Sequence, residues 1–459
     1  MRRKVKKNSY LLFVVCCLLF IHVTAQTSSV SPYSRYGIGE LQNNGFARNY
    51  ALGGSGIALQ SDSVAPFFVN IMNPASYASL RLTTFEVGML SNTTSLNDTG
   101  NNVVKNAVSL GYISFGIPFS KWWGGSFGLM PYSSVGYKIS DQKNIDSIGN
   151  VDYLYQGSGG INKLYFGNAI KIKNFSMGVN ASYLFGTINY SSRDILSDGI
   201  SFNTRVNKST TVNDIYFDYG LQYTIKIDSL RDKRTIKKDS LSSKILSRKK
   251  DIEDIKITFG LTSALQSDIS AKSTTLIERY KLTPYGTEIV KDTIPSTPDS
   301  KGTITLPFSI GAGMAIKKGE RWLVTGDYSV QNWSDFSLFG SNTNLKNSMK
   351  VSLGGQYVPA KQSDSQRNYW KKIHYRVGVK YYKTSLDLQN TPINEYSMSI
   401  GVGLPVGRVK ILQQFSMMNI SLELGQRGTT ANSLVKEQFV KATLGVTIND
   451  RWFIKTKFD

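Results

Sequence analysis

The sequence is poor in cysteine and histidine, with two of each among 459 residues. Cys16 and Cys17 stand together in an apolar run near the start, and His22 follows closely. If this leader is cleaved, the mature chain keeps no thiol and one histidine, His374. Disulfide frameworks, zinc sites and Cys-His nucleophile pairs are therefore excluded.

Long hydrophobic runs are also missing outside the leader. Residues 1–25 have a basic start, an apolar middle and a small-residue end at Ala25, before Gln26. This pattern predicts a Sec-type signal peptide cleaved near Ala25/Gln26. Val15, rather than a small residue, precedes Cys16, which disfavours lipidation. No later stretch reaches the ~20 apolar residues of a membrane helix, so helical membrane proteins are excluded.

What the chain does have is alternation at period two. From Val440 to Ile448 every second residue is apolar, with Lys441, Thr443 and Thr447 between them, and Trp452 follows at the very end. Apolar side chains on one face, small or polar ones on the other and aromatics at the end are typical of a membrane β-strand.

Such signals can be counted fourteen times. They predict an all-β fold, a transmembrane antiparallel β-barrel of about 14 strands, whose even number suits two periplasmic termini. The expected strands centre on residues 85–95, 107–119, 126–138, 163–172, 175–190, 214–227, 255–265, 305–316, 323–333, 348–358, 374–386, 396–404, 415–424 and 439–449. Tyr396, Met398 and Ile400 should face lipid, and so should Leu306 and Ile310.

Tryptophan and loop lengths give a check on this topology. Long outward loops are expected at 141–162, 191–213, 266–302 and 427–437, with mostly short inward turns except at 228–254 and 359–372. The topology puts one tryptophan, Trp333, at the outer rim and the other five at the periplasmic rim, where tryptophan is favoured: Trp122, Trp123, Trp322, Trp370 and Trp452.

The charge balance is strongly basic, with a formal net charge of +22. Residues 231–251 contain nine basic and three acidic side chains. We interpret them as a solvated turn or short surface helix. Anionic phospholipid headgroups or a periplasmic partner are the alternatives, and nucleic acid is not expected outside the cytoplasm.

Residues 26–81 differ from the rest because they lack sustained alternation. They are rich in turn formers such as Gly53-Gly54 and Asn73-Pro74, yet too apolar for a disordered tail. We therefore expect an N-terminal plug folded inside the lumen of the barrel. The predicted organisation is a signal peptide at 1–25, a plug at 26–81 and a barrel at 82–459, with a long inward connection at 228–254.

Two short stretches in the plug resemble a known family. Residues 51–58, Ala-Leu-Gly-Gly-Ser-Gly-Ile-Ala, and Asn70 to Ser76, with Asn73-Pro74-Ala75 directly before the first strand, are similar to the N-terminal hatch of FadL/TodX-type outer-membrane transporters, the long-chain fatty acid transporter family. The resemblance implies a monomeric outer-membrane barrel closed by the hatch, binding sites for hydrophobic compounds near the outer side, and lateral release through a strand kink.

The candidate ligand-path residues lie in this hatch. They are Phe67, Phe68, Ile71, Met72, Asn73, Pro74, Ala75 and Tyr77. The structural interpretation of the same residues is core packing of the hatch, with Asn73-Pro74 initiating a turn. No catalytic residue, metal ligand or cofactor site is expected. His374 has no carboxylate near it in sequence, so a lipid hydrolase is the least favoured reading.

The predicted function is passive uptake of hydrophobic small molecules, fatty-acid-like or aromatic, across the bacterial outer membrane. Expected partners are outer-membrane lipids and the hydrophobic substrate. The alternative is an accessory subunit of a protein-secretion system on the same scaffold, similar to PorV, which would bind protein partners through the outer loops.

Overall fold

The computed structural model describes residues 29–42, 45–61, 67–98, 100–146, 149–196, 201–227, 255–283, 285, 287–294, 300–360, 368–409 and 414–450. The expected signal peptide, the basic segment 231–251 and Trp452 lie outside these residues.

Fourteen antiparallel strands close into a barrel, which confirms the predicted fold class. Every predicted strand is present, and β20 pairs with β2 to close the ring, with Asp450 opposite Thr83. In order around the barrel they are β2 (Thr83–Asn97), β3 (Asn102–Pro118), β4 (Trp123–Ile145), β5 (Gly149–Ile172), β6 (Phe175–Leu196), β7 (Asn203–Ile227), β8 (Ile255–Ala264), β12 (Ser309–Lys318), β13 (Trp322–Gln331), β16 (Ser348–Tyr357), β17 (His374–Leu388), β18 (Thr391–Val409), β19 (Gln414–Arg427) and β20 (Lys436–Asp450).

The alternation of the sequence sets the two faces of the wall. On β18, Met398 and Ile400 are more than half exposed on the outside, whereas Ser399 between them is 1% exposed on the inside. A continuous outer band of Val, Leu, Ile, Phe and Tyr results, as a lipid-facing barrel requires. One expectation is wrong: Leu306 is buried, because Pro307 and Phe308 separate β11 from β12 and the inside-outside order is lost there.

The two ends of the barrel differ. We call the end with Thr83 and Asp450 the turn end, because β3 and β4, β5 and β6, and β12 and β13 are joined there by short connections. Trp122, Trp123, Trp322 and Trp370 lie at this end and are exposed. Trp333 lies toward the opposite end as predicted, but it is buried in an apolar cluster and is not an interfacial anchor.

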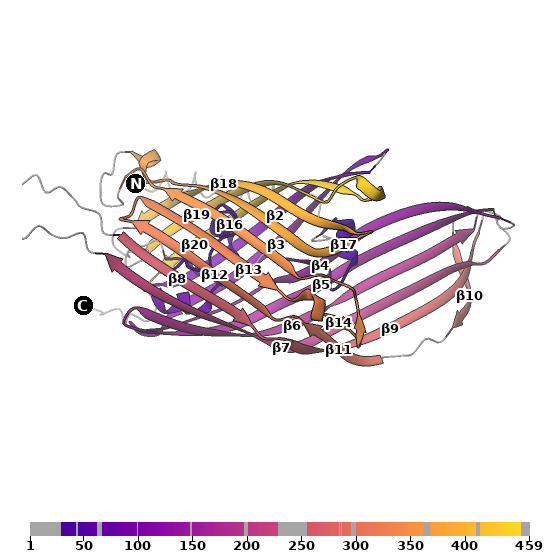
Figure 1. Ribbon diagram of the computed structural model, residues 1–459, viewed down its shortest axis with the longest axis horizontal. Coiled ribbons are helices and arrows are strands. Elements are labelled where there is room, and N and C mark those ends of the chain that lie inside the picture. The colour runs from indigo at the N-terminus through magenta and orange to yellow at the C-terminus, as the bar shows by residue number, and fades with distance from the viewer. Residues whose placement is uncertain are drawn as a thin grey trace, which may run out of the picture.

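At the opposite, extended end, one side of the wall continues far beyond the rest (Figure 1). The segments 141–162, 191–213 and 266–302, expected as loops, are mostly strand, because their Ser, Thr, Asn and Tyr residues continue the ladders of β4 to β7. The extension is completed by β9 (Ser267–Leu282), β10 (Glu288–Ile294), β11 (Ser300–Leu306), β14 (Ser337–Leu338) and β15 (Ser341–Asn342).

The remaining elements are short. The N-terminal segment, by which we mean the described residues of 29–82, contains η1 (Pro32–Arg35), β1 (Glu40–Leu41), α2 (Ala47–Tyr50) and η2 (Pro74–Ser79); η3 (Trp333–Asp335), η4 (Tyr369–Lys372) and η5 (Ala431–Ser433) join barrel strands. The N-terminal segment touches the inner faces of strands all round the barrel, from β2 and β6 to β13 and β18. Within the described ranges, no helix is long and apolar enough to cross a membrane.

Candidate functional site: a cavity beside the N-terminal segment

Polar side chains on the barrel wall hold the backbone of the N-terminal segment. The Asp327 carboxylate accepts hydrogen bonds from the N–H groups of Gly56 (2.6 Å) and Ile57 (2.9 Å). Glu86 accepts one from the Val69 N–H at 2.9 Å. On the adjacent strand β20, Asn449 bonds to both the N–H and the carbonyl of Phe67 at 3.0 Å. These bonds replace the pairings that an irregular buried backbone would otherwise lack.

Asn73 is the centre of a second set of bonds. Its side-chain Nδ2 donates to the carbonyls of Ile57 (2.8 Å), Leu221 (3.0 Å) and Leu261 (3.3 Å). Its Oδ1 accepts from the Ala75 N–H at 3.1 Å and so caps η2, which Pro74 begins. The motif thus forms the turn that its sequence indicates and ties that turn to β7 and β8.

Inward-facing glycines let this backbone approach the wall closely. A Cβ atom on Gly378 would lie 2.0 Å from the Gly53 nitrogen, and one on Gly178 would lie 2.5 Å from the Pro74 carbonyl carbon. A side chain at either place would push the N-terminal segment away from the barrel. The segment is therefore fitted to the wall and not merely enclosed by it.

Most of the predicted ligand-path residues pack instead of lining open space. Phe67, Ile71 and Tyr77 belong to one buried apolar cluster, and burial raises the pKa of the Tyr77 phenol, which donates to Asn180 at 3.1 Å. The Arg48 guanidinium lies over the Phe68 ring, with the guanidinium carbon 3.9 Å from the ring centre. In the described part of the chain, Phe67 and Phe68 line a void of about 10 Å³, roughly the room of one water molecule.

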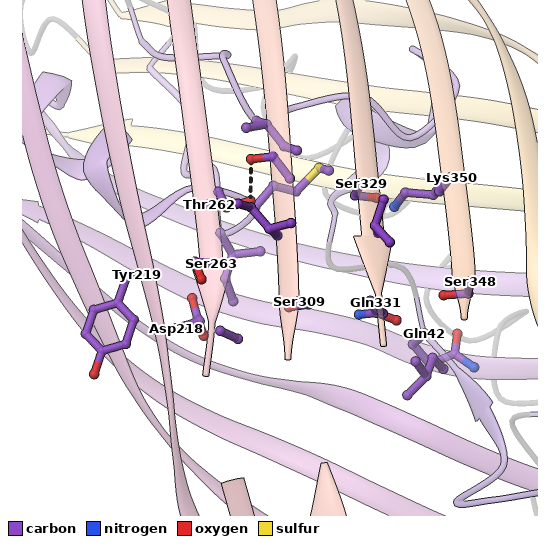
Figure 2. Close-up of a pocket in the computed structure, with 18 of the residues that line it drawn as sticks. Gln42, Asp218, Tyr219, Thr262, Ser263, Ser309, Ser329, Gln331, Ser348 and Lys350 are labelled. Carbon is purple, nitrogen blue, oxygen red and sulfur yellow. Dashed lines mark hydrogen bonds between the residues drawn. The ribbon is translucent and has the colours of Figure 1, made fainter. Parts of the chain in front are cut away.

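A larger cavity of about 190 Å³ lies between the N-terminal segment and the wall (Figure 2). Of the eight predicted residues, only Ile71 and Met72 line it. Ile57, Leu41 and Gln42 complete the inner side. The opposite side is formed by β7, β8, β12, β13, β16 and β17, including Tyr216, Asp218, Thr262, Ser309, Gln331, Ser348, Lys350, Lys380 and Tyr382.

The lining of the cavity is mixed in polarity. Asp218 accepts from Asn180 at 2.7 Å and lies 3.9 Å from the Lys163 ammonium. Lys380 is held by Glu395 (2.8 Å) and Glu423 (2.6 Å). The apolar contribution comes from Ile57, Ile71, Met72, Ala264 and aromatic rings, so the cavity offers an apolar side on the N-terminal segment and polar groups on the wall.

Beside this cavity the barrel wall divides between β3 and β4. The two strands pair only from Ile113 opposite Leu129 to Pro118 opposite Gly124. Beyond Leu129, β4 has an irregularity between Pro131 and Ser133, and its free edge pairs with Leu41 and Glu40 of β1. Residues 102–112 of β3 stay paired with β2 alone among the described residues. Tyr132, at the bend, lines the cavity.

A buried ion-pair network fixes the first part of the N-terminal segment near the extended end. Arg427 on β19 binds Glu40 (2.7 Å), Glu395 and Glu437, and Lys441 lies 3.6 Å from Glu40. Ser31 donates to Glu437, and Tyr33 donates to the Val435 carbonyl. Burial alone would raise the pKa of Glu40, but Arg427 and Lys441 lower it to about 2. Glu40 is therefore ionised and attaches this part of the N-terminal segment to Arg427 and Lys441 of the wall.

The wall residues that hold this site were not predicted from the sequence. Glu86, Asp218, Asp327 and Lys350 are isolated charges at inward positions of membrane strands, and an ionisable residue inside a membrane segment is itself a functional signal. His374 begins β17, and its buried Nδ1 has no partner in the described structure. Within the described ranges, no group of three or more metal-ligating side chains gathers.

Solved structures with a similar fold include toluene transporters and a FadL homologue. A Pseudomonas aeruginosa FadL homologue is 11% identical (TM-score 0.55), and the alignment covers 90% of this chain and 100% of the homologue. The P. putida toluene transporter TodX is 13% identical (TM-score 0.54; 90% and 100% covered), and the Ralstonia pickettii toluene transporter TbuX is 14% identical (TM-score 0.53; 89% and 100%). At these identities the likeness establishes the FadL-type barrel fold.

Sequence comparison adds a family model and no individual relative. The model described as BamG matches residues 5–252 and 242–459, which together span nearly the whole chain. No curated protein matches the sequence significantly.

Proposed function

The chain belongs to the BamG family, and we propose that it is an outer-membrane channel for the passive passage of hydrophobic small molecules. The observation that carries the proposal is the position of the cavity. It lies between the N-terminal segment and the wall, and it touches the bend of β4 where the wall divides. A molecule in the cavity therefore has lipid within reach on one side.

The divided wall supports lateral release. Val108 and Leu110 lie on the part of β3 that pairs with β2 but not with β4. Both side chains are exposed and apolar, so the edge of the opening is compatible with acyl chains. An unpaired strand edge in lipid is costly. On the β4 side that cost is reduced because β1 supplies a short replacement strand. We infer that the permeant leaves beside β1, between β3 and β4.

The N-terminal segment, in this proposal, acts as a plug that closes the lumen to water. Its bonds to Asp327, Glu86 and Asn449 and its close contacts with wall glycines favour a plug that stays in place while the permeant moves past it. The turn end then faces the periplasm and the extension faces outward, and a single barrel suffices for passage.

The size of the cavity supports one of the two predicted substrate classes, aromatic compounds. An apolar cavity of about 150 Å³ is known to hold benzene. The cavity of about 190 Å³ therefore has room for a compound with one aromatic ring beside its apolar residues Ile57, Ile71 and Met72. Two of the proteins of similar fold are toluene transporters, which agrees with this choice.

A cavity-filling variant tests the proposal. Ser329 faces the cavity from β13, and Ser329→Trp should block it. Ala312→Trp on β12 is the matched control, because Ala312 is exposed on the lipid side. We expect uptake of radiolabelled toluene by cells that depend on this chain to fall with Ser329→Trp and to persist with Ala312→Trp. Equal uptake by both variants would contradict the proposed path.

A second candidate, the accessory subunit of a protein-secretion system, is favoured by one observation. The extension carries the strand β10, which among the described residues pairs with β9 alone and exposes Ile289, Val290 and Ile294. Exposed apolar edge strands commonly bind other polypeptides. Purification in mild detergent distinguishes the two candidate functions. A protein that co-purifies in stoichiometric amount, and that is lost when β10 is altered, favours the secretion subunit over the channel.

A further inference from the structure

The turn end of the barrel carries lysines and large exposed apolar side chains together. In the β3–β4 connection, Lys121 is followed by Trp122, which is 58% exposed. Lys371 follows Trp370, which is 74% exposed, in η4 between β16 and β17. Both aromatic side chains stand at the boundary of the outer apolar band, where indole rings favour the headgroup level of a membrane.

The same combination recurs in the other two described connections at this end. Lys173 follows Ile172 between β5 and β6, and Lys318 ends β12 four residues before Trp322 of β13. Ile172 and Trp322 are both more than half exposed. Each described connection at the turn end thus places an exposed ammonium group beside an apolar anchor. The four connections belong to different parts of the circumference, so the charges form a rim and not one local patch.

The short turns at the extended end lack this pattern, although the longer connection between β13 and β16 carries one exposed lysine, Lys346. The short turns at 98–101, 389–390 and 428–435 contain no lysine, and the first of them begins with Asp98. At the turn end the described connections contain one acidic residue, Glu320. The pairing of an exposed lysine with a large exposed apolar side chain therefore recurs in the connections of the turn end and is missing from these three short turns.

We propose that this rim, consisting of Lys121, Lys173, Lys318 and Lys371 with their neighbouring apolar side chains, binds the anionic headgroups of phospholipids in the adjoining leaflet. A lysine stem can lie along apolar surface while its ammonium reaches the headgroup phosphates. A basic residue near an anionic membrane surface contributes about 1 kcal/mol, or about fivefold in affinity. The apolar neighbours favour a lipid over an acidic protein, because they fix each lysine at the headgroup level.

Lipid retention in nanodiscs tests this inference. The chain is placed in nanodiscs of mixed phosphatidylcholine and phosphatidylglycerol, and the lipids that remain bound are counted by native mass spectrometry. The rim variant is Lys121→Gln/Lys173→Gln/Lys318→Gln/Lys371→Gln. The control with the same change in charge is Lys105→Gln/Lys138→Gln/Lys272→Gln/Lys301→Gln, which alters exposed lysines toward the extended end.

We expect the unchanged chain and the control variant to retain phosphatidylglycerol preferentially, and the rim variant to lose at least about tenfold of that preference. The preference should also weaken with salt, because exposed charges are screened. Heat-modifiable gel migration verifies that each variant is folded. A rim variant that keeps the preference, a control that loses it equally, or an unchanged chain without preference overturns the inference. The last result would point to an acidic protein as the partner.

Discussion

Asp327 on β13 accepts a hydrogen bond of 2.6 Å from the backbone N–H of Gly56. The same oxygen accepts from Ile57, so one carboxylate satisfies two consecutive donors of the N-terminal segment. Hydrogen bonds to a charged group contribute about 1.5–3 kcal/mol each. This pair is therefore a principal attachment of the segment to the wall.

Removal of that carboxylate should loosen the segment locally. We expect Asp327→Ala to raise the hydrogen-exchange rates of the amides from Leu52 to Ala58 by at least about tenfold, because about 1.4 kcal/mol corresponds to a factor of ten. Asp335→Ala, at an exposed position in η3, is the control and should leave these rates unchanged. Unchanged protection in Asp327→Ala would show that the attachment lies elsewhere.

Two neighbouring glycines on β16 should respond differently to the same substitution. A Cβ on Gly354 would lie 2.5 Å from the Leu52 carbonyl oxygen, whereas one on Gly355 would meet nothing closer than 3.9 Å. Overpacking typically costs about 1–3 kcal/mol. Gly354→Ala should therefore lower the free energy of unfolding in guanidinium by that amount, and Gly355→Ala should be neutral or slightly stabilising. Equal effects would contradict the close approach.

The anchoring of Glu40 by Arg427 gives a pH dependence. The pKa of Glu40 is lowered to about 2 from its usual 4.5, so its ionised form is stabilised in the folded chain. This contribution is fully present above about pH 4.5 and is lost as the pH falls toward 2. We expect protection of residues 29–42 from protease to decline below pH 4, as Glu40 becomes protonated. In Arg427→Gln, protection should already be weak at pH 7.

Arg205 should hold β10 to the rest of the extension. Its guanidinium binds Glu278 on β9 (2.7 Å) and Glu288 on β10 (2.5 Å), and the side chain is 15% exposed. Arg205→Gln should accelerate proteolysis between 283 and 294. Arg279→Gln removes a pair with Asp292 that is about half exposed, and such pairs contribute at most about 1 kcal/mol. Its cleavage should match that of the unchanged chain, and equal acceleration in both variants would refute the role of Arg205.

The membrane strands could be predicted from the sequence because lipid on one side and packed interior on the other impose a strict period of two. Residues 396–404 illustrate this, since Met398 and Ile400 face outward and Ser399 inward. The extension could not be recognised in this way. The extension carries no continuous apolar face, so polar residues such as Ser191 and Asn207, which bond across β6 and β7, indicated a loop.

The candidate site was predictable only in part. The motif Asn73-Pro74 indicated a turn, and the apolar residues around it indicated burial, but the sequence could not distinguish packing from cavity lining. Phe67 and Tyr77 only pack, Ile71 packs with them and also borders the cavity, and Met72 lines the cavity. This difference depends on which strand each side chain meets. Pro131, inside an expected strand, was a usable signal for the bend of β4, since proline within a sheet marks an edge or a bulge.

The central claim is that the barrel passes hydrophobic compounds and stays closed to water and ions. The most direct test uses the purified chain in asymmetric bilayers with a lipopolysaccharide outer leaflet, measuring toluene flux and ionic conductance on the same membranes. We predict a toluene flux that depends on the protein, without porin-like conductance. An open-pore conductance, or a toluene flux equal to that of the protein-free membrane, would contradict the account.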